Sequence, residues 1–154
     1  MRITVIAVGK LKERFWREAA DEYLKRLTAY ATVRVVEITD RDPVRGEARA
    51  MAEEASDILR AVPDGAHVIA LDLGGKQLTS EAFSARLDAL GLDGRSSVAF
   101  VIGGSTGLDA SVLARADEKL SLGQMTLPHN LARIVVLEQI YRAFRISRGE
   151  PYHK

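Results

Sequence analysis

Short runs of apolar and β-branched residues alternate along this chain with stretches in which apolar residues recur at helical spacing. The short runs predict strands at 2–8, 33–38, 67–73, 97–102 and 119–122. The helical spacing predicts helices at 13–30, 49–62, 79–90, 109–116 and 131–147. The run from Ser97 to Ile102 is apolar almost throughout, which is typical of a strand buried on both faces of a parallel sheet.

Clusters of glycine, proline and aspartate separate these runs. Asp42-Pro43 and Pro63-Asp64-Gly65 break the chain before and after one helix, and Gly74-Gly75 is expected to end the third strand. We find no repeat, low-complexity tract or linker. Strands that alternate with helices predict one α/β domain over residues 1–154, with a largely parallel sheet flanked by helices.

Composition excludes several classes of protein. The 154 residues include no cysteine, which excludes disulfide scaffolds, cysteine-ligated zinc, iron–sulfur clusters and thiol nucleophiles. The three histidines lack metal-ligand spacing, so we expect no metal site and a structural role for His67. No apolar run reaches the length of a membrane span and the N-terminus has no signal-peptide pattern, which predicts a cytoplasmic protein with no membrane contact.

Charge is unevenly distributed although the net charge is only +1. The section 61–120 is acidic, and the section 121–154 is basic, which indicates that the C-terminal end faces a polyanion. Four arginines in or directly after the last predicted helix contribute to this: Arg133, Arg142, Arg145 and Arg148. The alternative is an ordinary solvated helix face, on which Arg142 pairs with Glu138 four residues earlier.

Three glycine-containing loops follow predicted strands, where open α/β sheets bind their ligands. They span 73–76, 103–107 and 123–129. Glycine lets backbone amides and carbonyls approach a ligand closely, and the apolar stretch that Pro128 ends is suited to a planar ligand such as adenine. For each loop the alternative is a plain connection between elements. The loop 103–107 is neither a Walker motif nor a nucleophile elbow.

Six blocks of this sequence together closely resemble the ribosomal RNA large subunit methyltransferase H family, which belongs to the SPOUT class of methyltransferases. The blocks are 1–12 (MRITVIAVGKLK), Leu71-Asp72, 100–108 (FVIGGSTGL), 121–129, 138–147 (EQIYRAFRIS) and 148–154 (RGEPYHK). They occur in the family's order from one end of the chain to the other, and the section 39–60 is the least similar to the family.

The resemblance implies a C-terminal trefoil knot, a homodimer and S-adenosylmethionine as the methyl donor. It implies N3 of a pseudouridine in 23S rRNA, within the ribosome or large subunit, as the acceptor. Carried over by position, it implies cofactor contacts at Leu71, Gly103, Leu122, Gly123, Gln124, Met125, Thr126 and Leu127. The wide apolar face of the last helix also favours a dimer.

For catalysis the resemblance points to the C-terminal tail. His153 is the candidate for taking the N3 proton, Arg142 for orienting the base or the RNA, and Tyr152 for stacking or hydrogen bonding. Two alternatives stay open at this point. One is a ribosome-associated nucleoside-binding module without turnover, and the other is a small-molecule methyltransferase.

Overall fold

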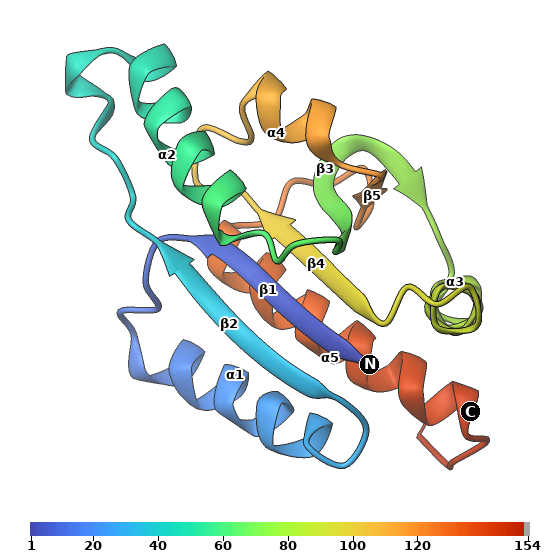
Figure 1. The fold of residues 1–154 in the computed structure, drawn as a ribbon. Coiled ribbons are helices and arrows are strands. Elements are labelled where there is room, and N and C mark those ends of the chain that lie inside the picture. The colour runs from blue at the N-terminus through green and yellow to red at the C-terminus, as the bar shows by residue number, and fades with distance from the viewer. Residues whose placement is uncertain (153–154) are drawn as a thin grey trace.

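Five parallel strands form one sheet, in the order β2-β1-β4-β3-β5, in the computed structural model, which describes residues 1–152 (Figure 1). The strands are β1 (Arg2–Val8), β2 (Thr32–Ile38), β3 (His67–Gln77), β4 (Ser97–Ile102) and β5 (Glu118–Ser121). Each neighbouring pair is parallel. The predicted α/β fold with a parallel sheet is therefore confirmed, and the predicted bounds of β1 and β4 match the structure.

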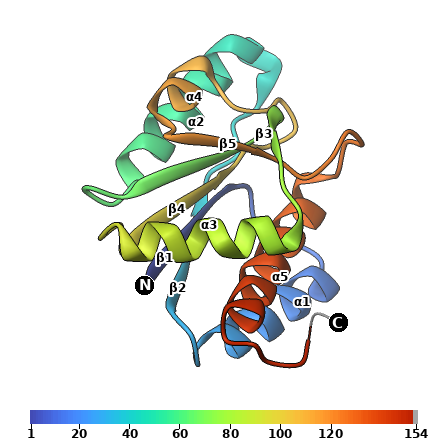
Figure 2. The same cartoon turned by 90° about the vertical axis from the view of Figure 1, so that its right-hand side faces the viewer.

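Helices cover both faces of this sheet (Figures 1 and 2). They are α1 (Arg14–Leu27), α2 (Glu47–Ala61), α3 (Ser80–Leu92), α4 (Ala110–Arg115) and α5 (His129–Ser147), with a short 3-10 helix η1 (Pro43–Arg45) before α2. One core packs α1, α3 and α5 on one face, and a second packs α2 and α4 on the other. In β4, Phe100 belongs to the first core and Val101 to the second, so this strand is buried on both faces as expected.

The third strand is longer than predicted. Gly74-Gly75 does not end it, because β3 continues to Gln77 after an irregularity in its pairing with β5. A Cβ on Gly75 would lie 2.7 Å from the backbone nitrogen of Leu120 in β5. The glycine therefore lets β3 and β5 approach closely. The expectation of a ligand loop at 73–76 is wrong for residues 74–76, and only Leu73 lines the cavity described below.

The long helix α5 packs between α1 and α3 (Figure 2). Its side chains Leu137 and Ile140 are fully buried, and Tyr141 is nearly so. The centre of the wide apolar face is thus covered within its own chain, while Ile134 and Phe144 stay half-buried. Although α5 has 19 residues, no helix among residues 1–152 is long and apolar enough to cross a membrane.

Candidate functional site

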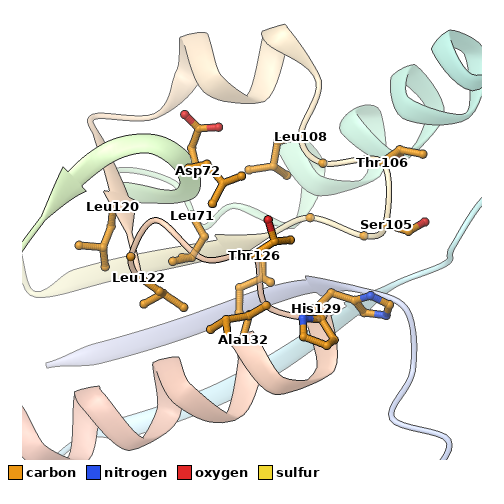
Figure 3. A pocket seen from close by; sticks show the side chains of 18 of the residues that line it. Leu71, Asp72, Ser105, Thr106, Leu108, Leu120, Leu122, Thr126, His129 and Ala132 are labelled. Carbon is orange, nitrogen blue, oxygen red and sulfur yellow. The ribbon is translucent and has the colours of Figure 1, made fainter.

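A cavity of about 680 Å³ opens at the carboxyl edge of the sheet, where the middle of β3 and the segments after β4 and β5 meet the start of α5 (Figure 3). The segment after β4 contributes residues 103–108, the segment after β5 contributes most of residues 122–128, and α5 contributes His129 and Ala132. Parallel strands end at one edge of their sheet, which is why loops far apart in sequence share this wall. The size is that of a small-molecule site, which is roughly 300–1,000 Å³.

The glycine loop after β4 folds back on itself. Gly107 has a φ of 82°, and Gly104 and Gly107 form an isolated bridge. A Cβ on Gly103 would lie 2.8 Å from the backbone carbon of Gly107, so this glycine is required by the loop itself. Any larger residue at Gly103 would therefore distort the loop, and its effect on binding would not be separable from its effect on folding.

The segment after β5 forms neither helix nor strand from Leu122 to Pro128. Ser121 anchors its start, because the Ser121 hydroxyl accepts a hydrogen bond from the Gly123 amide (3.2 Å) and donates one to the Gly123 carbonyl (3.0 Å). Pro128 ends the segment as the N-cap of α5. The backbone between these two anchors is outside regular pairing and lies against the cavity, where it is available to a ligand.

Two ionisable side chains, Asp72 and His129, line a wall that is otherwise neutral. Figure 3 shows Asp72 on the side of the cavity near α4 and His129 at the start of α5. A carboxylate among leucine side chains favours a ligand that carries a positive charge. The cavity therefore combines backbone polar groups, apolar walls and one acidic group, which suits a cationic nucleoside.

The structure brings together nearly all of the residues expected to bind the cofactor. Leu71, Gly103, Leu122, Gly123, Met125, Thr126 and Leu127 all line the cavity. Gln124 is exposed on the same segment and does not line it. Sequence reasoning missed Leu120 and Ala132, and it assigned no binding role to Asp72. The position of Asp72 directly after Leu71, at the end of the buried part of β3, is the signal that points to it.

The candidates Arg142 and Tyr152 form a separate cluster with Glu138. The Arg142 guanidinium donates to Glu138 at 2.7 Å, and its centre lies 4.6 Å from the centre of the Tyr152 ring. The Tyr152 hydroxyl donates to Glu138 at 3.2 Å. The hydrogen bond to Glu138 raises the pKa of Arg142. Burial, followed by the charge of Glu138, raises the pKa of Tyr152.

This cluster is not at the cavity of its own chain. Ala132 lines the cavity, and Arg142 follows ten residues later on α5. At about 1.5 Å per residue, they lie roughly 15 Å apart along the helix. His153, the third catalytic candidate, lies outside the described residues. The structure therefore does not join Arg142 and Tyr152 to the cofactor candidates within one chain.

The other arginines of α5, and Arg148 directly after it, are largely engaged with their own chain. Arg133 is 2% exposed and donates to Glu37 at 2.7 Å. Arg145 pairs with Glu150, and Arg148 lies over the ring of Tyr30. The pairing of Arg142 with Glu138 also confirms the alternative interpretation of that residue. The expectation of a polyanion-facing surface is wrong for Arg133, because folding buries its side chain against β2.

His67 lies at the opposite, amino edge of the sheet, away from the cavity. Its Nε2 is 2.7 Å from a Glu118 carboxylate oxygen, and the Arg86 guanidinium donates to the same carboxylate at 2.7 Å. Burial alone would raise the pKa of Glu118, but the hydrogen bonds from Arg86 and His67 outweigh it and lower this pKa below its ordinary value. The cluster ties the start of β3 to β5 and α3.

Comparison with known proteins agrees with this architecture. A family model described as "Predicted SPOUT methyltransferase" matches residues 1–153. The chain is 54% identical over 159 aligned residues to ribosomal RNA large subunit methyltransferase H of Listeria welshimeri. It is 51% identical to the protein of the same name from Bacillus thuringiensis. Both alignments cover the full length of both proteins.

Solved structures share the fold at low sequence identity. A probable methyltransferase from Bordetella pertussis superposes with a TM-score of 0.59 at 17% identity, over 93% of this chain and 96% of that one. A probable methylase family protein from Haemophilus influenzae gives a TM-score of 0.55 at 17% identity, over 99% of this chain and 70% of that one. A family model thus matches nearly the whole chain, and full-length relatives share one name. The chain therefore belongs to the SPOUT methyltransferase family, as a member of its ribosomal RNA large subunit methyltransferase H group.

Proposed function

We propose that this protein is an S-adenosylmethionine-dependent methyltransferase that modifies N3 of a pseudouridine in 23S rRNA, within the ribosome or large subunit. The observation that carries the proposal is the cavity at the carboxyl edge, built from the strand-end segments of a chain in this family. The relatives named ribosomal RNA large subunit methyltransferase H support RNA as the acceptor, and they favour it over a small metabolite or binding without turnover.

The residues of the cavity fit the cofactor chemically. Leu71, Leu122 and Leu127 supply apolar surface for an adenine ring, and Gly103 with the backbone of 122–127 supplies polar groups for its edges. The carboxylate of Asp72 complements the positive charges that S-adenosylmethionine carries. When bound, this cofactor supplies a methyl group that is a strong electrophile, because the sulfur that carries it is positively charged.

The remaining chemistry falls to the protein, which orients the base and removes the N3 proton. We assign proton removal to His153, because histidine titrates near neutrality. Arg142 stabilises the negative charge that develops on the base, and Tyr152 stacks on it or donates a hydrogen bond. The trefoil knot implied by the resemblance stays a prediction.

Arg142 and Tyr152 meet a cavity only if two chains combine. The separation of roughly 15 Å along α5 keeps the Arg142–Tyr152 cluster of one chain from its own cavity. We therefore propose a homodimer in which the Arg142–Tyr152 cluster of one subunit completes the cavity of the other. This arrangement also brings a second basic surface to an otherwise nearly neutral protein.

One set of measurements tests the proposal. Thr126 lines the cavity and Gln124, on the same segment, does not, so we expect Thr126→Trp to abolish calorimetric binding of S-adenosylmethionine and Gln124→Trp to preserve it. Methyl transfer is measured with labelled cofactor and assembled ribosomes, free rRNA or small metabolites. Label on N3 of a pseudouridine supports the proposal. Label only on metabolites, or binding with no transfer to any acceptor, contradicts it.

Mixing experiments test the shared site. Thr126→Trp and a chain lacking residues 152–154 are each expected to be folded but inactive. The Thr126→Trp chain keeps an intact C-terminal tail, and the truncated chain keeps an intact cavity. A mixed dimer therefore contains up to about one complete site, and activity returns on mixing. If both proteins form dimers and exchange subunits without recovering activity, the site is not shared. A stable monomer at micromolar concentration contradicts the homodimer itself.

A further inference from the structure

The connection between β1 and α1, residues 9–13, starts beside the cavity, and we call it the rim. A Cβ on Gly9 would lie 3.7 Å from Nε2 of His129, and the Val8 side chain lies 3.1 Å from the Cβ position of Gly104. His129 and Gly104 both line the cavity. Figure 3 shows the end of the N-terminal strand, in blue, beside His129. This connection, the β1–α1 loop, therefore leaves the sheet next to two residues that line the cavity.

Hydrogen bonds hold the backbone of the β1–α1 loop in place. The Gly9 amide donates to the Ile38 carbonyl at 2.8 Å, and the Gly9 carbonyl accepts from the buried Arg133 at 2.8 Å. Further along, the Arg17 guanidinium donates to the carbonyl of Leu11 at 3.1 Å and to the carbonyl of Lys12. The loop is thus preorganised, so its exposed side chains project from a defined backbone.

Its exposed side chains carry positive charge that the protein itself does not neutralise. Lys10 and Lys12 are exposed, and within residues 1–152 neither forms an ion pair. Arg14 pairs with Glu18, but this pair is largely exposed and contributes little to stability. The stretch 10–17 holds four basic residues and one acidic residue. In contrast, most of the α5 arginines already bind carboxylates.

We propose that Lys10, Lys12 and Arg14 bind phosphate groups of the RNA strand whose base enters the adjacent cavity. The proposal rests on the proposed function, since an RNA base cannot reach the cavity without bringing its flanking phosphates to the rim. Lysine ammonium groups on a fixed backbone suit phosphates, which repeat at every nucleotide and need no fixed angle of approach. Such contacts position the strand and leave the choice of base to the cavity.

The test compares two double variants with the same loss of charge. Lys10→Gln/Lys12→Gln removes the two unpaired cations of the rim. Lys25→Gln/Arg95→Gln is the control, because Lys25 is exposed at the end of α1 and Arg95 is exposed just before β4, both toward the amino edge of the sheet. Methyl transfer to ribosomes over a salt series gives KM, kcat and the salt dependence, and calorimetry gives the affinity for S-adenosylmethionine.

For the rim variant we expect KM for ribosomes to rise about tenfold or more, with kcat and cofactor affinity near wild type. The slope of log affinity against log salt should fall by about 1–2, as expected when up to two phosphate contacts are lost. The control variant should match wild type. A wild-type KM and salt slope in the rim variant overturn this inference while leaving the proposed function intact.

Two other results also overturn the inference. A raised KM with an unchanged salt slope means that the rim contacts a ribosomal protein and not RNA. Dissociation of the rim variant into monomers in sedimentation means that the rim contacts a second copy of this chain. Failure of the proposed function is visible separately, because the wild-type protein then transfers no methyl group to any RNA.

Discussion

Gly75 and Gly74 are neighbours in β3 whose surroundings differ, and this difference allows a matched test of the fold. A Cβ on Gly75 would lie 2.7 Å from backbone atoms of both Lys119 and Leu120, whereas ordinary contact begins at 3.4 Å. To accept Gly75→Ala, β3 and β5 must separate by about 0.7 Å or distort, and overpacking of this kind costs roughly 1–3 kcal/mol. A Cβ on Gly74 meets only the Asp72 side-chain carboxylate at 3.1 Å, which is free to rotate away.

We therefore expect Gly75→Ala to lower the free energy of unfolding by about 2 kcal/mol, or Tm by about 4–8 °C for a chain of this length. Gly74→Ala should stay within about 0.5 kcal/mol of wild type, because alanine also reduces the freedom of the unfolded chain. Urea unfolding and calorimetric melting measure both. Since Leu120 lines the cavity, Gly75→Ala should also weaken cofactor binding. Equal stability of the two variants refutes the reasoning.

Two further predictions concern charged side chains that tie elements together. Arg133→Met should destabilise the protein by about 1–3 kcal/mol in urea unfolding, because it leaves the buried Gly9 carbonyl without its donor; a loss below about 0.5 kcal/mol contradicts this. The pKa of Glu118 is lowered in the folded state, so its contribution is present above its unfolded pKa of about 4.3 and is lost as pH falls through the folded pKa. Glu118→Gln, which weakens the contacts to Arg86 and His67, should destabilise the protein at about pH 7 but much less near pH 3, and a pH-independent difference contradicts this.

Local patterning determined the architecture. The apolar runs of β1 and β4 give their bounds directly, since strands buried on both faces are apolar almost throughout. The alternation of strands and helices predicts a parallel sheet, and parallel strands end at a common edge. The position of the cavity, and the presence there of Gly103 and most of 122–127, therefore follow from the sequence.

Tertiary packing decided which residues continue a strand and which charged side chains are buried, because neighbours in the sequence do not determine these features. Gly75 continues a strand because Leu120, 45 positions later, passes against it. Arg133 looks like any exposed helix arginine until the fold places Glu37 and the Gly9 carbonyl beside it. Helical spacing depends only on nearby residues, whereas burial and ion pairing depend on contacts between distant segments. For the same reason, only the three-dimensional structure separates the Arg142 cluster from the cavity along α5.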